Sequence, residues 1–280
     1  MEKYLLIAFM LFAPAAKQPV KPIACCGKTA TEQFAAFASD PSFVKVHGIP
    51  APFTYAEGLG KDIQFTAADG TPAHGYEFTA PSKSKNYLLV IHDYLGLGDY
   101  AKNESEKYFK TLKDVNVIDI DLYDNKSTTN PDTARKLMAA VKTDRAVSII
   151  QGAIKMLGPD ARIGTIGWCF GGGWSLQTAL AAGQQTVACV VFYGMPEQNV
   201  DKLKGLHSDV LGIFANKDKW ITPAVVSTFQ DNMKAAGKTL TVDKYDADHG
   251  FGNPSSPAHN ELAATDSYSK AAGYLHARFK

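Results

Sequence analysis

The stretch Gly167-Trp168-Cys169-Phe170-Gly171 decides the fold, because it places a cysteine between two glycines at a turn. Residues 162–166 before it are typical of a short strand, and residues 174–182 after it are typical of a helix. In a sharp strand–turn–helix connection, the central residue takes a strained backbone conformation and presents its side chain at the end of the strand. The stretch therefore predicts an elbow that carries Cys169 as a nucleophile. The alternative is a glycine-rich turn around a buried cysteine.

Strand-like and helix-like segments alternate on both sides of this elbow. A hairpin around Asp69-Gly70 comes first, and buried strands are predicted over residues 87–91, 115–120, 187–193, 210–215 and 240–245. Helices are predicted over residues 104–112, from Pro131 to about residue 157, and over 223–236 and 262–279. This alternation predicts an α/β protein with a doubly wound, mainly parallel sheet flanked by helices.

Composition narrows the classes of function. The chain has 280 residues, 45% of them hydrophobic, and a formal net charge of +1. It is long enough for one large core, and it has no basic run of the kind that binds nucleic acid. After the N-terminus no apolar run is long enough to span a membrane. The expected partner is a small-molecule substrate, and a monomer is favoured.

The N-terminus has the features of an export signal. An apolar run over residues 4–13 follows Met-Glu-Lys and precedes Ala13-Pro14-Ala15. We interpret residues 1–15 as a signal peptide of a periplasmic or secreted protein, 16–60 as an extension and 61–280 as the catalytic domain. The alternatives are an ordinary N-terminal element and a lipoprotein signal that ends at Cys25. The vicinal pair Cys25-Cys26 has no assigned role.

A thiol nucleophile needs a base and a group that orients this base. Asp218 directly follows the strand over 210–215, and His249 follows the strand over 240–245. Functional side chains of parallel sheets gather at such strand ends, and the order nucleophile, acid, histidine is that of α/β-hydrolases. Cys169, Asp218 and His249 are therefore the predicted triad. His47 is not expected to be the base, because it lies in the extension.

Two backbone amides are expected to form the oxyanion hole, those of Phe170 and of Tyr94 in the loop after the strand over 87–91. Four aromatic side chains near the predicted loops are candidates for the wall of the substrate pocket: Tyr123, Trp168, Trp220 and Phe251. No phosphate-binding loop, dinucleotide fingerprint or metal-binding spacing is present, so neither a metal nor an organic cofactor is expected.

With these residues in place, the chain resembles the dienelactone hydrolase family over about residues 61–280. The resemblance is carried by Gly-Trp-Cys169-Phe-Gly-Gly-Gly, Asp121-Leu122-Tyr123, Asn-Lys-Asp218 and Asp-His249-Gly-Phe. It implies an α/β-hydrolase fold and cofactor-free hydrolysis of small lactones or carboxylic esters through an acyl-cysteine.

The chain also departs from the family pattern. Members acting on anionic dienelactones carry a glutamate that helps to ionise the cysteine, and the matching position is Asp93, a candidate for poising the thiol. Two arginines of those members correspond to Asn125 and Asn253. Because arginines bind carboxylates through charge-assisted hydrogen bonds, their loss predicts a neutral ester or lactone as substrate. The alternatives are a non-catalytic binding protein and a thiol-redox protein that uses Cys169.

Overall fold

The computed structural model describes residues 28–50, 52–56 and 58–280. The predicted signal peptide and the Cys25-Cys26 pair lie outside the described residues. Among these residues, no helix has the length and apolar character needed to cross a membrane.

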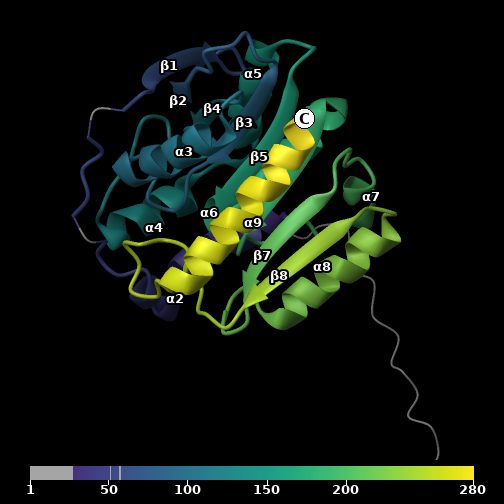
Figure 1. Cartoon of the computed structure of the whole chain (residues 1–280). Helices are drawn as coiled ribbons and strands as arrows, with labels where there is room; N and C mark the ends of the chain where they lie inside the picture. The colour runs from purple at the N-terminus through teal and green to yellow at the C-terminus, as the bar shows by residue number, and fades with distance from the viewer. Residues whose placement is uncertain (1–27, 51, 57) are drawn as a thin grey trace, which may run out of the picture.

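An eight-stranded sheet forms the centre of the protein (Figure 1). Its strands lie in the order β1-β2-β4-β3-β5-β6-β7-β8, with antiparallel pairing of β1 with β2 and of β2 with β4, and parallel pairing of all the others. The doubly wound, mainly parallel sheet is thereby confirmed. The strands are β1 (Lys61–Thr66), β2 (Pro72–Phe78), β3 (Asn86–Ile91), β4 (Asn116–Ile120), β5 (Arg162–Trp168), β6 (Thr186–Phe192), β7 (Val210–Ala215) and β8 (Leu240–Tyr245).

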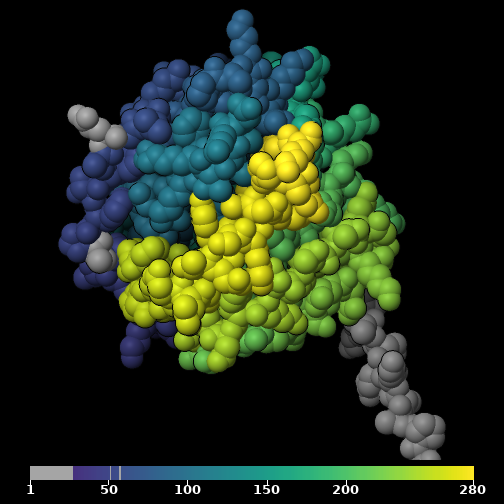
Figure 2. All heavy atoms as spheres, in the orientation of Figure 1, coloured from purple at the N-terminus to yellow at the C-terminus, as the bar shows by residue number. Residues whose placement is uncertain are grey.

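Helices cover both faces of the sheet. On one face α3 (Asp99–Leu112) packs beside the C-terminal helix α9 (Glu261–Phe279), which crosses the front of Figure 1. In the space-filling view this yellow helix fills the region between the blue and green parts of the chain (Figure 2). On the other face α5 (Thr143–Leu157) packs against α6 (Phe170–Ala182). The remaining elements are α4 (Pro131–Ala140), η2 (Gly183–Gln185), α7 (Val200–Leu203) and α8 (Pro223–Ala235).

Local chemistry explains where the helices differ from the prediction. The segment after Pro131 forms two helices, because Val141 and Lys142 take extended conformations with ψ of 123° and 128°. Asn130 caps the first of these helices, since its side chain accepts a hydrogen bond from the Thr133 amide at 3.0 Å. Helix α3 begins at Asp99, five residues before the predicted start, because its polar first turn hides the apolar periodicity.

The segment before the sheet is ordered into three short helices: α1 (Ala30–Ala35), η1 (Ala36–Ser39) and α2 (Pro41–Val46). Thr29 caps α1 in a reciprocal capping box with Glu32, and Asp40 caps α2. Helix α1 contacts α6, and Phe34 and Phe43 are each 1% exposed. Part of the predicted extension therefore belongs to the hydrophobic core.

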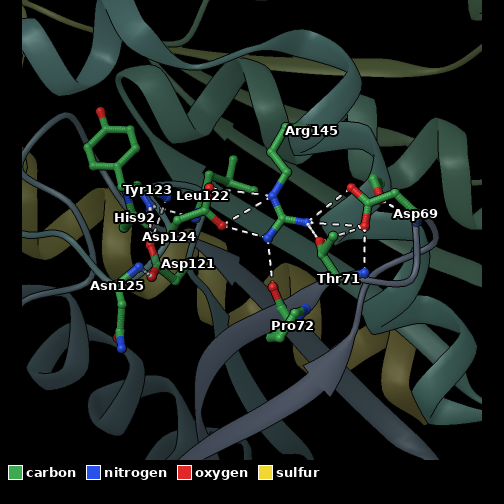
Figure 3. A network of polar contacts seen from close by, with 11 residues as sticks. Asp69, Thr71, Pro72, His92, Asp121, Leu122, Tyr123, Asp124, Asn125 and Arg145 are labelled. Atoms are coloured by element: carbon green, nitrogen blue, oxygen red, sulfur yellow. Dashed lines mark hydrogen bonds and ion pairs between the residues drawn. The ribbon is translucent and has the colours of Figure 1, made fainter.

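Arg145 on α5 ties the edge of the sheet to the loop after β4 (Figure 3). Its guanidinium donates to Asp124 Oδ1 at 2.6 Å, to the Pro72 carbonyl at 2.7 Å and to Thr71 Oγ1 at 2.5 Å. In the same loop, Asp121 Oδ1 accepts a hydrogen bond from the Tyr123 amide at 2.8 Å. The loop after β4 is thus fixed from two sides.

Two glycines permit the tight β5–α6 turn. A Cβ atom on Gly167 would lie 2.2 Å from the Gly171 carbonyl oxygen, and one on Gly171 would lie 2.2 Å from the Ile91 carbonyl oxygen. Real Cβ atoms do not approach backbone that closely, so β3, β5 and α6 meet here only because these positions lack side chains.

We therefore predict that Gly171→Ala lowers the free energy of unfolding by about 3 kcal/mol or more, because the added methyl must displace the backbone of β3. The exposed helical Gly273, whose added Cβ would meet nothing within 4 Å, is the matched control. Gly273→Ala should raise stability by about 0.5–1 kcal/mol. Urea unfolding of both variants checks this, and equal effects would show that the close approach at Gly171 does not limit stability.

Candidate active site

Cys169 lies at the C-terminal end of β5 in a strained conformation. Its φ of 57° and ψ of −119° fall in a region that L-residues rarely adopt. The Cys169 amide donates to the Phe192 carbonyl at 3.0 Å, and its carbonyl accepts from the Gly172 amide at 3.1 Å. The two hydrogen bonds hold the turn, and they place the predicted nucleophile at the sheet edge where parallel strands end.

The structure brings the three predicted triad side chains together. His249 Nε2 lies 3.3 Å from Cys169 Sγ, and His249 Nδ1 lies 2.6 Å from Asp218 Oδ2. All three side chains are buried, with exposed fractions of 4% or less. Because a carboxylate only accepts hydrogen bonds, Asp218 requires the proton on Nδ1, which directs the lone pair of neutral His249 Nε2 at the sulfur.

Asp218 is held as a carboxylate by the turn that follows β7. Its Oδ1 accepts hydrogen bonds from the Trp220 and Ile221 amides at 2.8 and 2.9 Å. Burial alone would raise the pKa of Asp218, but His249 and these amides lower it. The loop sequence therefore both places the carboxylate and keeps it ionised.

Burial also changes the pKa values of Cys169 and His249, in opposite directions. It raises the pKa of the Cys169 thiol, and the neighbouring His249 opposes this effect. For His249, burial disfavours the charged imidazole, but the Asp218 carboxylate and the Cys169 sulfur raise its pKa above the ordinary value. His249 is therefore a strong base directed at a weakly acidic thiol.

Aromatic rings enclose the His249 imidazole. Its ring centroid lies 5.2 Å from that of Tyr193, 5.8 Å from those of Phe43 and Trp220, and 6.1 Å from that of Phe34. Two of these rings come from the N-terminal helices, and Trp220 Nε1 donates to Asp40 Oδ2 at 2.9 Å. The segment before the sheet thus shields the His249–Asp218 pair from water.

His47 is a site residue that the sequence analysis did not assign. Its Nε2 lies 3.7 Å from Cys169 Sγ, and its Nδ1 donates to the Phe43 carbonyl at 2.6 Å. Burial, and then the charge of His249, lower the pKa of His47 to about 3. The available signal was the apolar repeat of Phe34, Phe37 and Phe43, which indicates that this segment packs on the domain.

Two amides are predicted for the oxyanion hole, those of Phe170 and Tyr94. Among the backbone hydrogen bonds of the described residues, neither amide donates to a carbonyl. The Phe170 amide faces Cys169, and its hydrogen bond lowers the pKa of the thiol. The Tyr94 carbonyl fixes the loop after β3, because it accepts a hydrogen bond from Tyr123 Oη at 3.1 Å. His92 connects the loop after β3 to the loop after β4, because its Nε2 accepts a hydrogen bond from the Leu122 amide at 3.0 Å.

A cavity opens beside Cys169. His47, Gly48 and Pro50 form one part of its wall, and the other walls come from α3 and the loops after β3, β6 and β8. Trp168, one of the four predicted pocket aromatics, lines it. The other three are buried in the surrounding packing: Tyr123 against Phe170, Trp220 against Phe43 and Phe251 against Tyr193.

Asp93 lies in the cavity wall without a hydrogen bond to the sulfur. Its Oδ1 accepts from the Leu95 amide at 2.8 Å, and its Oδ2 accepts from Asn253 Nδ2 at 3.2 Å. Burial raises the pKa of Asp93 to about 6, and these two hydrogen bonds oppose the shift. The Asp93 charge in turn raises the pKa of Cys169.

The two asparagines that match the family's arginines lie in different places. Asn253 lines the cavity, where its amide binds Asp93. Asn125 is exposed, and it lines a separate hollow beside His74 and Lys102. Figure 3 shows Asn125 next to Asp121, whose carboxylate accepts a hydrogen bond from the Asn125 amide.

Known proteins are similar to this chain in sequence or in fold. A 25% identical relative, "Protein usf" of Aquifex pyrophilus, matches over 205 residues, which are 70% of this chain and 88% of its own. The crystal structure of a dienelactone hydrolase-like promiscuous phosphotriesterase from metagenomic libraries superposes with a TM-score of 0.68 at 19% identity, covering 80% of this chain and all of that one. The dienelactone hydrolase of Anabaena variabilis gives a TM-score of 0.58 at 15% identity, covering 79% of this chain and all of that one.

These similarities confirm the α/β-hydrolase fold and the resemblance noted in the sequence. The family model named "Dienelactone hydrolase family" matches residues 74–279, from the second strand of the sheet to the end of the last helix. The match includes the loops that carry Cys169, Asp218 and His249. The chain therefore belongs to the dienelactone hydrolase family.

Proposed function

We propose that this protein hydrolyses a small neutral carboxylic ester or lactone through an acyl-cysteine intermediate. The observation that carries the proposal is the contact series from Cys169 Sγ through His249 to Asp218, with steps of 3.3 and 2.6 Å, beside a cavity. Nucleophile, base and orienting carboxylate are the parts that nucleophilic acyl transfer requires. Membership of a hydrolase family supports the reaction class.

In the first half of the reaction, His249 Nε2 removes the thiol proton as Cys169 Sγ attacks the acyl carbon. Asp218 stabilises the imidazolium that forms, because its Oδ2 accepts the Nδ1 proton at 2.6 Å. The carbonyl oxygen gains negative charge in this step, and the Phe170 and Tyr94 amides donate to it. Such preorganised donors are typically worth about 3 kcal/mol each.

The intermediate then collapses, and His249 returns its proton to the leaving alkoxide, which departs as an alcohol. A water molecule enters, His249 takes one of its protons, and the hydroxide attacks the thioester carbon. Cleavage of the carbon–sulfur bond releases the carboxylic acid, and the proton on His249 goes back to the Cys169 sulfur. The aromatic rings around His249 strengthen the charge pairs by excluding other water.

The charge of the cavity wall supports a neutral substrate. Within the part of the chain that the structure describes, no lysine or arginine lines this cavity, whereas the carboxyl groups of Asp93 and Glu104 do. Apolar surface from Leu95, Tyr100 and Trp168 completes the wall. Binding an anionic substrate would bury a negative charge without a cationic partner, which costs several kcal/mol.

We predict that Cys169→Ala lowers the rate of p-nitrophenyl acetate hydrolysis by about a thousandfold or more, because the variant lacks the sulfur that forms the proposed acyl intermediate. Cys189 is also free and buried, but it lies within β6 away from the cavity, so Cys189→Ala is the matched control and should keep most of the activity. Initial rates and mass spectrometry of an acyl adduct on Cys169 check both points. Equal rates in wild type and Cys169→Ala would instead favour a binding or thiol-redox protein.

We also predict selection against anionic substrates. The kcat/KM for p-nitrophenyl butyrate should exceed that for the monoester of succinic acid with p-nitrophenol by about tenfold or more, because the succinate carboxylate finds no cation in the cavity. The spontaneous hydrolysis rates of both esters are subtracted. A higher kcat/KM for the succinate ester would contradict the neutral-substrate assignment.

Asp93 gives the cavity wall a charge that depends on pH. Above its pKa of about 6 the carboxylate is charged and disfavours the Cys169 thiolate; below it the group is neutral and has no such effect. Asp93→Asn should therefore react with iodoacetamide at the wild-type rate below about pH 5, and about threefold or more faster above pH 7.

The exposed Asp231 on α8 provides the matched control, since Asp231→Asn should follow the wild-type profile throughout. Alkylation is measured on Cys169 by peptide mass spectrometry, so the other cysteines do not contribute. A rate ratio that stays constant from pH 5 to pH 8 would show that Asp93 does not influence the thiol.

A further inference from the structure

We propose that His47, Cys169 and His249 form a binding site for Zn²⁺, which blocks the thiol while the metal is bound. The site would give the N-terminal segment a direct role in controlling the nucleophile. His249 and His47 are 80 and 122 residues from Cys169 in sequence, so no short metal-binding motif reveals the site. The inference does not depend on the proposed hydrolysis, because it concerns binding to the resting protein.

The distances suit tetrahedral zinc. With Zn–S near 2.3 Å and Zn–N near 2.0 Å, a tetrahedral site has sulfur–nitrogen edges of about 3.5 Å and a nitrogen–nitrogen edge of about 3.3 Å. Cys169 Sγ lies 3.3 Å from His249 Nε2 and 3.7 Å from His47 Nε2. The three atoms all lie within 4.8 Å of one another, so small side-chain movements would complete the site.

Hydrogen bonding shows that both nitrogens present lone pairs to the sulfur when the histidines are neutral. The Phe43 carbonyl and the Asp218 carboxylate can only accept, so His47 and His249 carry their protons on Nδ1. A thiol has one proton and can donate it to only one of the two Nε2 atoms. A cation bound to the thiolate would satisfy all three atoms, and its binding would release this one proton to solvent.

The groups around the ligands match those of established zinc sites. Zinc-bound histidines almost always donate their second N–H to a carboxylate or a backbone carbonyl, which fixes the ring. Asp218 is the acceptor for His249, and the Phe43 carbonyl is the acceptor for His47, both at 2.6 Å. The His47 backbone is also fixed, because its carbonyl accepts a hydrogen bond from Tyr94 Oη at 3.1 Å.

The donor set selects the kind of metal. One thiolate and two imidazoles favour zinc and similar transition metals over Mg²⁺ and Ca²⁺, which prefer oxygen ligands. His47 and Cys169 line the cavity, so the fourth coordination position would face it and take water. With the thiolate lone pair on the metal, Cys169 could not attack an acyl carbon.

Cobalt absorption spectroscopy provides a test that is independent of hydrolysis. Titration of the untagged full chain with Co²⁺ should give thiolate-to-cobalt charge-transfer absorption that saturates at one equivalent and is displaced by Zn²⁺. The band should be absent in Cys169→Ser and should persist in the Cys25→Ser, Cys26→Ser double variant. Loss of the band in that double variant would place the metal on the vicinal cysteines and overturn the proposal.

His47 is tested by Zn²⁺ titration calorimetry. His47→Ala should bind Zn²⁺ at least tenfold more weakly, and His47→Phe, which keeps an aromatic ring against Phe43, should show the same loss without the packing defect. His259 has an imidazole paired with Glu261, so His259→Ala serves as the matched control and should bind normally. Unchanged affinity in folded His47→Phe would overturn the site.

The hydrolase assay separates the two proposals. Charge-transfer binding without any Cys169-dependent ester hydrolysis would support the metal site and refute the proposed function. Hydrolysis that depends on Cys169 but is unaffected by stoichiometric Zn²⁺, with no charge-transfer band, would refute the metal site and leave the function intact. If both proposals are correct, Zn²⁺ should inhibit hydrolysis and a chelator should restore it.

Discussion

The strained backbone conformation of Cys169 controls the geometry of the β5–α6 turn and of the groups around it. A φ of 57° at a residue with a side chain is unfavourable, and it persists because β3, β5 and α6 are packed too closely for another path. Gly167 and Gly171 make this approach possible by having no side chains. The same geometry directs the sulfur at His249 and leaves the Phe170 amide without a backbone acceptor. One local constraint therefore positions the proposed nucleophile and one of the two amides proposed for the oxyanion hole.

Burial of the triad sets its electrostatics. Desolvation raises the pKa of the Cys169 thiol, whereas the Asp218 carboxylate raises the basicity of His249. The aromatic rings that remove water come partly from helices before the first strand, and Asp40 ties these helices to Trp220. Because water is excluded, the interaction between Asp218 and His249 is stronger than it would be at an exposed surface. The N-terminal helices thus act on the chemistry even though they lie outside the sheet.

His47 brings the segment before the sheet into contact with the sulfur of Cys169. Both imidazoles present Nε2 to one sulfur, and each has its Nδ1 proton bound by a fixed acceptor. Asp93, on the opposite loop, adds a carboxyl group whose charge opposes ionisation of the thiol. Burial and the charge of Asp93 therefore both oppose ionisation of the Cys169 thiol in the resting site.

The sheet, the elbow and the meeting of Cys169, Asp218 and His249 could be predicted from the amino-acid sequence. These features follow from local signals: continuous apolar runs, glycines two positions either side of Cys169, and polar residues directly after strands. Three features become visible only in the folded chain: His47 reaches the sulfur, Asn125 lines a separate hollow, and Tyr123, Trp220 and Phe251 pack around the cavity without lining it. The physical reason is that periodicity predicts whether a residue is buried, whereas its neighbours depend on how segments distant in sequence pack, and no local pattern encodes that packing.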